Sequence, residues 1–233
     1  MFNHIDGLQF LEPTVTSEDG MRYYQFGDIE KMPSITSVLS KQPGKMKGLA
    51  DWRKRVGQEK AASITRRASR AGTIVHGIIE KHLRNEKVDL SELSDIQGAE
   101  LGWLSGADMF NTLLPILERI DNINALEVPL FSEHLGLAGR VDCIAEYDGE
   151  LSVIDFKTSS KIKKKEWITD YFLQSCAYAI MWEERTNIPI TQIVIIMAVY
   201  CDDPIIFIEH RDNWDKKLVD VIDVYKRFIE LPI

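Results

Sequence analysis

The sequence predicts an α/β protein in which a mixed central sheet follows a mainly helical N-terminal region. Apolar residues recur at helical spacing through much of the first half of the chain, whereas the second half contains five short apolar stretches of strand length. The predicted order of elements is helix, three strands, helix, two strands and a closing helix. The central strands are apolar at successive positions, which is typical of a sheet covered on both faces.

The first 120 residues are expected to form the helical region. Ser34 precedes a helical turn and is therefore a predicted N-cap. The longest helical stretch is expected to break near Gly57 and Arg70, and the last helix is expected to continue through Pro115. The expected elements are a hairpin at 21–32, a short helix at 34–40, helical residues at 47–84, a polar acidic connector at 89–98 and a helix at 96–120.

The second half is expected to form the sheet. Asp148 and Gly149 are a strong signal for a two-residue hairpin turn between two of its strands. The whole chain of 233 residues is expected to be a single domain, with residues 1–120 as its helical part and residues 121–233 as its α/β core. The expected strands are residues 124–132, 136–147, 150–158, 192–200 and 204–210, and the expected helices are residues 168–186 and 212–230.

Positive charge is concentrated in two segments, although the net charge of the chain is −8. Residues 41–70 carry ten Lys or Arg and two acidic residues, and residues 157–165 carry five lysines and no acid. Such blocks on an acidic body can confine a polyanion to one groove. The alternative is that they are ordinary solvated surface.

The sequence shows no sign of export or membrane insertion. No apolar run approaches the roughly 18 residues of a membrane span. The N-terminal twenty residues lack the pattern of a secretory signal and the arginines of a mitochondrial transit peptide. Cys143, Cys176 and Cys201 are odd in number and widely spaced, which favours a reducing compartment over a disulfide scaffold.

Two acids and a lysine lie among apolar residues beside the predicted hairpin turn. The register set by the loop Asp148–Gly149 places Asp142 opposite Asp155, and alternation along the strand places Lys157 on the same face. Two unit charges about 5 Å apart repel by roughly 3 kcal/mol at an effective dielectric constant of about 20. A cross-strand pair contributes only about 0.2–1 kcal/mol. A bound cation or a shared proton would relieve this repulsion.

Two carboxylates with no thiolate partner favour a hard, oxygen-seeking ion such as Mg²⁺ or Mn²⁺. A phosphodiester is a suitable substrate, because such an ion polarises the phosphoryl oxygen and lowers the pKa of bound water. Lys157 would orient that water or neutralise the developing charge. The alternative is an ordinary ion pair between Asp155 and Lys157, since the triplet at 215–217 shows that acid-x-Lys also arises by chance.

Several segments, in order along the chain, resemble the RecB-type branch of the PD-(D/E)xK nuclease superfamily. They are AGTIVHGIIE at 71–80, Glu127 in ALEVPL, GRVD at 139–142, IDFKTS at 154–159 and QSCAY at 174–178. Within this branch the chain is similar to the family of mitochondrial genome maintenance exonucleases and their phage relatives, through MPSITSVLSK and the long stretch from Leu137 to Ser159. The similarity covers about residues 22–230. It implies the core of a restriction-endonuclease-like fold.

The resemblance also implies a metal-dependent DNA exonuclease that favours single strands. It implies that His76, Asp142 and Asp155 hold Mg²⁺ or Mn²⁺ together with the carbonyl oxygen of Phe156, and that Asp142, Asp155 and Lys157 are catalytic. Glu127 is a further candidate at the site. The expected substrate contacts are Ser34, Thr158, Gln174 and Tyr178 from the motifs, and Arg66 and Arg70 from the basic segment.

Each of these residues also has a purely structural interpretation. Glu80, one helical turn after His76, is expected to form a local salt bridge. Trp167 and Tyr171 would either stack on bases or belong to the core, and the core is the expectation. The other structural alternatives are a core histidine for His76, an exposed strand residue for Glu127, a simple helix cap for Ser34 and solvated helix residues for Arg66, Arg67 and Arg70.

The first functional hypothesis is an exonuclease that threads a DNA strand between the basic helical region and the acidic site. The alternatives are an endonuclease or nuclease subunit of a helicase complex, and a non-catalytic nucleic-acid-binding module on a nuclease fold. The chain has no G-x-x-x-x-G-K-[ST] loop and hence no motor of its own. We expect a monomer that works with replication or recombination proteins in the cytoplasm of a bacterium or phage-infected cell.

Overall fold

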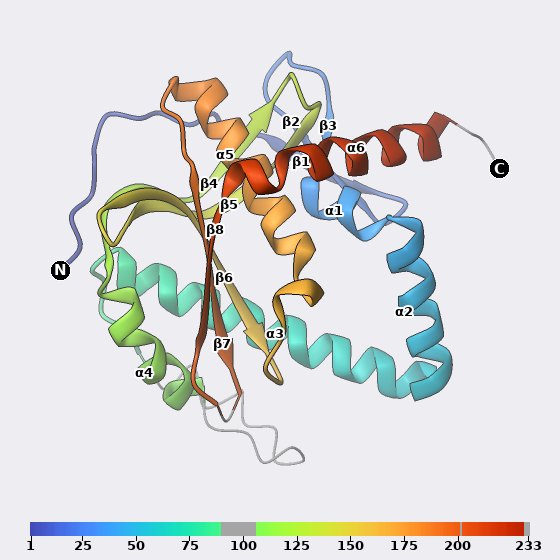
Figure 1. Ribbon diagram of the computed structural model, residues 1–233, viewed down its shortest axis with the longest axis horizontal. Coiled ribbons are helices and arrows are strands. Elements are labelled where there is room, and N and C mark those ends of the chain that lie inside the picture. The colour runs from blue at the N-terminus through green and yellow to red at the C-terminus, as the bar shows by residue number, and fades with distance from the viewer. Residues whose placement is uncertain (90–105, 201, 231–233) are drawn as a thin grey trace.

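The computed structural model describes residues 1–89, 106–200 and 202–230. Within them a five-stranded sheet lies between two groups of helices, as Figure 1 shows. Neighbouring strands are antiparallel except for one parallel pair, so the predicted α/β fold with a mixed sheet is confirmed. In sheet order the strands are β4 (Ile120–Ser132), β5 (Leu137–Tyr147), β6 (Glu150–Ser159), β7 (Gln192–Val199) and β8 (Ile205–His210).

The connections explain the strand directions. β5 and β6 are joined by Asp148 and Gly149, whose positive φ values of 54° and 83° suit a two-residue hairpin turn. β6 and β7 are parallel because α5 (Thr169–Thr186) carries the chain back along the sheet between them. The predicted hairpin and the predicted helix between the third and fourth strands are therefore confirmed.

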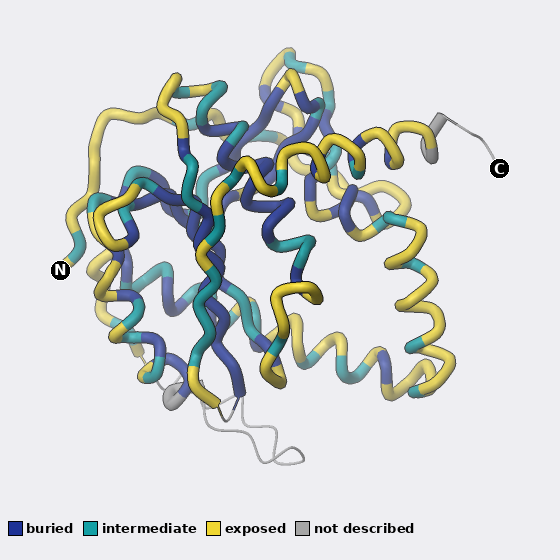
Figure 2. Tube along the Cα trace, viewed as in Figure 1, coloured by how far each residue is buried: buried dark blue, intermediate teal, exposed yellow. Residues whose placement is uncertain are grey.

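The sheet separates two apolar cores, because side chains alternate along β7 between its two faces. Ile195 packs in the core formed with α1, α5 and α6, and Ile196 packs in the core formed with α3 and α4. Figure 2 shows buried strands at the centre and exposed residues along α2 and α6. The other helices are α1 (Ile35–Ser40), α2 (Pro43–Val56), α3 (Gln58–Leu83), α4 (Gly106–Leu117) and α6 (Asp215–Glu230).

The helices of the N-terminal region lie close to the predicted ranges, although α2 begins at Pro43, before the predicted start at residue 47, and one predicted break is absent. α2 and α3 separate at Gly57, whose φ of 89° breaks the helix as expected. The break expected near Arg70 is wrong, because α3 runs through it without a proline, and a helix tolerates Gly72. α4 includes Pro115 as expected. Most of the acidic connector and the first part of the helix expected at 96–120 lie outside the described residues.

A second, three-stranded sheet precedes α1. Its antiparallel strands are β1 (Thr14–Glu18), β2 (Met21–Gln25) and β3 (Met32–Pro33). β2 and β3 form the hairpin expected at 21–32, whereas β1 is absent from the prediction. Asp19 and Gly20, with φ values of 49° and 73°, form the turn between β1 and β2. This is the same Asp-Gly signal that identifies the hairpin of the larger sheet.

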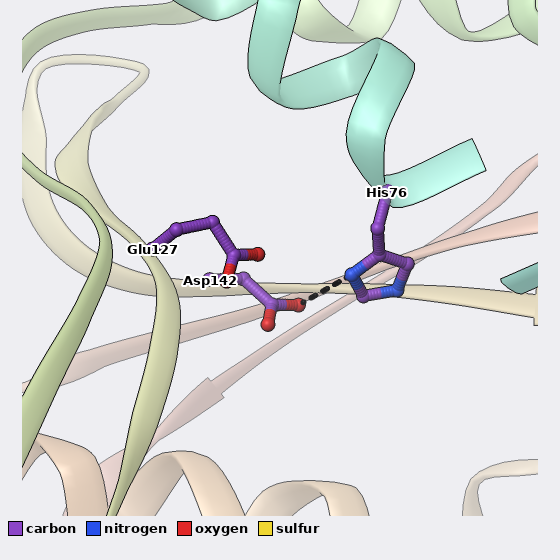
Figure 3. Close-up of side chains that lie close together, drawn as sticks. All are labelled: His76, Glu127 and Asp142. Carbon is purple, nitrogen blue, oxygen red and sulfur yellow. Dashed lines mark ion pairs between the residues drawn. The ribbon is translucent and has the colours of Figure 1, made fainter. Parts of the chain in front are cut away.

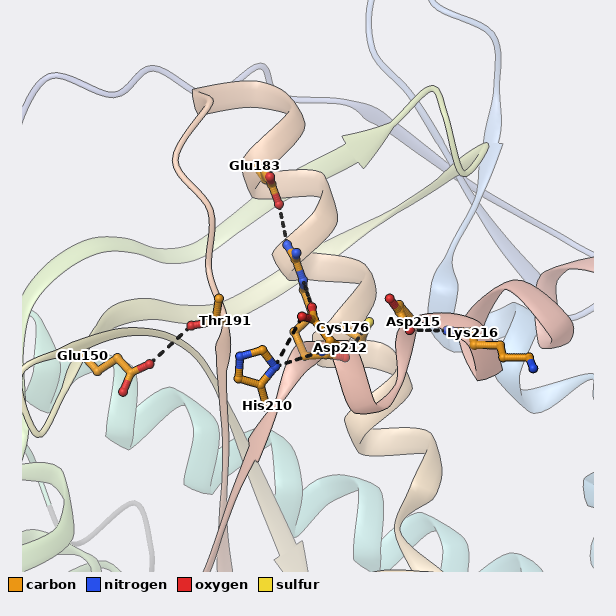
Figure 4. Close-up of polar contacts among 9 residues, drawn as sticks. Glu150, Cys176, Glu183, Thr191, His210, Asp212, Asp215 and Lys216 are labelled. Atoms are coloured by element: carbon orange, nitrogen blue, oxygen red, sulfur yellow. Dashed lines mark hydrogen bonds and ion pairs between the residues drawn. The ribbon is translucent and has the colours of Figure 1, made fainter.

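Polar contacts hold the junction of α5, β8 and α6, and Figure 4 shows them in close-up. Arg211, directly after β8, forms ion pairs with Glu183 of α5 and with Asp212. Cys176 Sγ of α5 donates a hydrogen bond to the Arg211 carbonyl oxygen at 3.8 Å. A short 3₁₀ turn at Arg211–Asn213 follows, so α6 begins at Asp215, slightly later than predicted.

The described cysteines are consistent with the absence of a disulfide scaffold. Cys143 and Cys176 are buried free thiols, and burial raises the pKa of both. Cys201 lies outside the described residues. In the part of the chain that the structure describes, we find no helix with both the length and the apolar character needed to cross a bilayer.

Candidate active site

Three carboxylates lie in one row across the sheet: Glu127 on β4, Asp142 on β5 and Asp155 on β6. We call them the acidic row. Glu127 and Asp142 lie opposite one another on β4 and β5 but do not form a ladder pair. The residues before and after them do pair in this ladder. The β5–β6 ladder follows the predicted register from the turn to the pair Cys143 and Ile154. It ends one position before Asp142 and Asp155, so the ladder pair expected between these two acids is not formed.

A side chain replaces the missing ladder contact. Asp142 Oδ2 accepts a hydrogen bond from the backbone N–H of Phe156 at 2.9 Å. The carboxylate thus satisfies a donor that the backbone of β5 would otherwise meet in a continuous ladder. As a result, the backbone pairing of β5 and β6 ends at the acidic row, while the side chain of Asp142 remains hydrogen-bonded to the backbone of β6.

Three ligand atoms converge beside this row, as Figure 3 shows. His76 of α3, Glu127 and Asp142 each offer one ligand atom, and these atoms all lie within 4.8 Å of one another. His76 Nδ1 is 3.6 Å from Asp142 Oδ2. Glu127 has a left-handed backbone with φ of 54°, which is uncommon outside glycine. The side chain of Glu127 lines the pocket at the site together with His76 and Asp142.

Asp155 is held separately from these three ligand atoms. It is 1% exposed, and its carboxylate lies 2.5 Å from Lys157 Nζ. Gln174 Nε2 of α5 donates to Asp155 Oδ1 at 3.3 Å. Asp155 Oδ2 accepts no hydrogen bond of good geometry from the described residues, but it is ion-paired with Lys157 Nζ at 2.5 Å. A buried carboxylate needs a cationic partner; Lys157 is such a partner here, and carboxylate oxygens are also ligands for hard divalent cations.

The environment shifts the pKa of four side chains at the site, those of His76, Glu127, Asp155 and Lys157. Burial raises the pKa of Asp155 to about 7 against the opposing effect of Lys157, and burial together with Asp142 raises the pKa of Glu127 to about 7. Burial lowers the pKa of Lys157, but the two aspartates raise it by more. Burial also lowers the pKa of His76, although Asp142 opposes this. A neutral imidazole is the form that binds a metal.

A pocket of about 670 Å³ opens over the site. Asp155 and Phe156 lie beneath its surface and are not among its lining residues, which agrees with their burial. Thr158 lies next to α3, because its Oγ1 would be 3.7 Å from a Cβ on Gly72. The sequence-predicted residues that line this pocket are Ser34, His76, Glu127, Asp142, Lys157, Gln174 and Tyr178.

The glycine of the GRVD segment has a steric role. A Cβ on Gly139 would lie 2.7 Å from Tyr178 Oη and 2.8 Å from Tyr178 Cε1. The ring of Tyr178 therefore packs directly against the backbone of β5. Gln174, one turn earlier on α5, reaches Asp155 from the same helix face.

Ser34 occupies the N-cap position of α1, but its side chain does not cap the helix. It is 1% exposed, and its hydroxyl shares a hydrogen bond of 2.7 Å with Thr36 Oγ1. The simple capping interpretation is therefore wrong. The expected salt bridge of Glu80 is present, with Arg84 Nη2 2.9 Å from Glu80 Oε1.

Arg66 and Arg70 do not line the 670 Å³ pocket over the carboxylates, which we call the acidic pocket. They line a separate pocket of about 720 Å³ between α2 and α3, together with Arg53. The structure therefore does not bring these arginines to the acidic row. The interpretation of Trp167 as a core residue is also wrong, since its side chain is 62% exposed.

Some residues that line the acidic pocket are not among the site residues predicted from the sequence. Arg140 lies within the GRVD segment, and its guanidinium donates a hydrogen bond to the carbonyl oxygen of Glu127. Because Arg140 and Asp142 belong to the same short motif, the sequence could have identified Arg140 as a residue near the site. Arg22 and Tyr24 reach the pocket from β2, and no local pattern relates that strand to the larger sheet.

Comparisons with known proteins agree on one family. A family model described as the PD-(D/E)XK nuclease superfamily matches residues 50–206. The chain is 29% identical over 181 residues to mitochondrial genome maintenance exonuclease 1 of Homo sapiens, covering 73% of this chain and 50% of that protein. The protein of the same name from Mus musculus is 31% identical over 138 residues, covering 57% of this chain and 38% of that protein. The chain thus spans about half or less of the length of these relatives.

One solved structure is also similar in part. It comes from Eubacterium rectale and is provisionally described as an exonuclease, with 19% sequence identity and a TM-score of 0.42. The match covers 70% of this chain and 66% of that chain.

Proposed function

The chain belongs to the PD-(D/E)XK nuclease superfamily, and we propose that it is a metal-dependent deoxyribonuclease that degrades single-stranded DNA from its ends. The observation that carries this proposal is the meeting of His76, Glu127, Asp142 and Lys157 in one pocket above Asp155. The names of the curated relatives support the exonuclease mode.

The residues fit a divalent ion, for which we propose Mg²⁺ or Mn²⁺. His76, Asp142 and Asp155 would hold it, with the Phe156 carbonyl and Glu127 as further ligands. The fit rests on the ligand atoms of His76, Glu127 and Asp142, which lie within 4.8 Å of one another, and on the buried carboxylate of Asp155 in the neighbouring strand, which is paired with Lys157. When bound, such an ion polarises a phosphoryl oxygen and lowers the pKa of water.

The protein groups act on the phosphate and on the attacking water. In hydrolysis the water oxygen forms a bond to phosphorus, the bond from phosphorus to the leaving sugar oxygen breaks, and that oxygen takes up a proton. Lys157 would donate hydrogen bonds to the water or to the phosphate oxygens as charge develops. Asp155 and Gln174 position Lys157 and each other through the contacts at 2.5 and 3.3 Å. Tyr178 would support this arrangement from the same helix.

We further propose that the helical part, residues 1–120, binds DNA and that the whole chain acts as one domain. Ser34, Thr158, Gln174 and Tyr178 would contact the strand near the acidic row. Arg66 and Arg70 would hold phosphates in the groove between α2 and α3, since each carries a positive charge into that groove. The strand would therefore run from this groove to the acidic pocket.

The proposed setting is a monomer in the cytoplasm of a bacterium or phage-infected cell. The genome-maintenance names of the relatives support work alongside replication or recombination proteins. Light scattering of the purified protein tests the monomer, and a stable dimer in solution would contradict it.

The decisive assay compares linear and circular single-stranded DNA of the same sequence. Linear strands labelled at either end are incubated with Mg²⁺, Mn²⁺ or EDTA. We expect loss of the linear strand alone, and only with a divalent ion. Cutting of the circle would instead support an endonuclease, and binding without any cutting would support a non-catalytic module.

A lysine variant tests the role of the pocket. Lys157→Ala is expected to abolish cleavage while leaving folding and DNA affinity largely intact. Lys217→Ala is the matched control, because Lys217 also ends an acid-x-Lys triplet but lies on α6 and outside the acidic pocket. Wild-type cleavage by pure Lys157→Ala protein would refute the assignment.

A further inference from the structure

We propose that Trp167 is a stacking platform for a base of the substrate strand, next to the acidic pocket. The inference rests on the proposed function and deepens it. The indole is 62% exposed, although an indole is largely apolar and is more often buried. The contrast within the chain is clear, since Trp182 is fully buried and Trp214 stacks on Phe172 at 4.6 Å between ring centroids.

Trp167 lies on the short connection between the two elements that supply the site. The 3₁₀ turn η2 (Lys165–Trp167) joins β6, which carries Asp155 and Lys157, to α5, which carries Gln174. Tyr171 in the first turn of α5 has its ring centroid 5.1 Å from Lys157 Nζ. The exposed indole is therefore four residues from a side chain that contacts the proposed catalytic lysine.

The same connection lies beside the basic helices. Lys45 of α2 forms an ion pair with Asp170 at the start of α5. In Figure 1 the connection between β6 and α5 is drawn between the central sheet and α2. A strand that runs from the basic groove to the acidic row would pass this region.

Packing does not explain the position of Trp167. Its neighbour Ile168 is 1% exposed and anchors the segment in the core, so the indole is not needed for that purpose. Lys164 Nζ lies 5.7 Å from the indole centroid, and Lys164 is itself exposed. An exposed lysine beside an exposed ring holds neither group firmly in place.

The surroundings favour a single-stranded nucleic acid as the occupant. Four lysines and one acidic residue, Glu166, lie in the segment 160–168. Lys163 Nζ donates to Tyr171 Oη at 3.2 Å, and Lys165 pairs with Glu209. Ammonium groups beside an open aromatic face match a strand whose bases stack while its phosphates meet positive charge. A duplex offers no free base face except at its ends, so it fits less well.

Binding without cleavage tests the inference. Fluorescence anisotropy in EDTA measures the affinity for a labelled oligo(dT) and for an abasic oligonucleotide of the same length. We expect Trp167→Ala to weaken oligo(dT) binding by between about fivefold and a hundredfold, and to leave abasic binding unchanged. Trp167→Phe should retain most of the oligo(dT) affinity, because phenylalanine keeps a stacking face.

Two controls separate stacking from charge and from general damage. Lys164→Ala should lower the slope of log affinity against log salt by about 0.7, the value for one phosphate contact on a single strand, whereas Trp167→Ala should leave that slope unchanged. Val219→Ala removes another exposed apolar side chain, on α6 and 49% exposed, and should change neither affinity. Thermal unfolding of each variant checks that it is folded.

The outcomes distinguish this inference from the proposed function. If the wild-type protein degrades linear DNA but Trp167→Ala and Trp167→Phe both bind oligo(dT) as tightly as wild type, the platform is refuted and the nuclease stands. Equal losses for oligo(dT) and abasic strands would also overturn stacking. If the wild-type protein neither binds nor cuts DNA, the proposed function itself fails.

Discussion

Replacing Gly139 by alanine tests how closely α5 packs against β5 beneath the acidic row. The added methyl group would lie 2.7 Å from Tyr178 Oη, 2.8 Å from Cε1 and 3.2 Å from Cζ. Tyr178 is 2% exposed, so most of its ring is enclosed by the core, although it also lines the acidic pocket. The ring or the strand must therefore move by roughly half an ångström or more to restore normal contact.

The expected magnitude follows from this overlap. Inserting a methyl group into a well-packed core destabilises a protein by about 1–3 kcal/mol. For a chain of this size each kcal/mol lowers the melting temperature by about 2–4 °C, so Gly139→Ala should melt about 2–12 °C below wild type. Cleavage should also fall, because Gln174 sits on the same helix as Tyr178 and donates to Asp155.

Gly77 provides the matched control. It lies within α3 beside the same pocket, and nothing lies within 4 Å of the position of an added Cβ. Gly77→Ala should therefore stabilise the protein, by up to about 1 kcal/mol, through helix propensity. Differential scanning calorimetry on both variants decides the matter. If Gly139→Ala melts at the wild-type temperature, the close approach of Tyr178 is refuted.

Three further predictions concern the metal and the DNA. Asp142→Asn should raise the melting temperature of metal-free protein, because it removes repulsion from Glu127 while the amide oxygen can still accept a hydrogen bond from the Phe156 N–H. The same variant should bind Mn²⁺ at least about tenfold more weakly by calorimetry. A lower melting temperature would contradict the first expectation. Mn²⁺ at about a hundred times its dissociation constant should stabilise wild type by about 2.7 kcal/mol, reversibly with EDTA, and no shift would argue against a site. Arg66→Ala should lower the salt slope of single-strand binding by about 0.7 without changing Mn²⁺ affinity, and an unchanged slope would remove Arg66 from the DNA path.

Local signals predicted the larger sheet well. Asp148 and Gly149 define a turn whose geometry requires positive φ, and this alone sets the register of β5 against β6. The same reasoning applied to Asp19 and Gly20 would have found β1, but the flanking residues Thr14–Glu18 are all exposed and carry no apolar pattern. A turn signal is therefore most informative where its strands also bury a face.

The details of the site depend on interactions that no local pattern contains. The ladder ends before Asp155 because the Asp142 carboxylate takes the Phe156 N–H, a choice between side chain and backbone that only the folded sheet decides. The family resemblance identifies Glu127 as a candidate, yet its left-handed backbone has no sequence signature. The separation of Arg66 from the acidic pocket likewise follows from the packing of α2 against α3.

The account depends on a divalent ion held between His76, Asp142 and Asp155. Crystals soaked in Mn²⁺ and measured at its absorption edge would locate that ion directly by anomalous scattering. We predict a strong peak within coordination distance of the Asp142 and Asp155 carboxylates, with Lys157 Nζ drawn away from Asp155. The absence of a peak at this row, with Mn²⁺ bound elsewhere or not at all, would contradict the account.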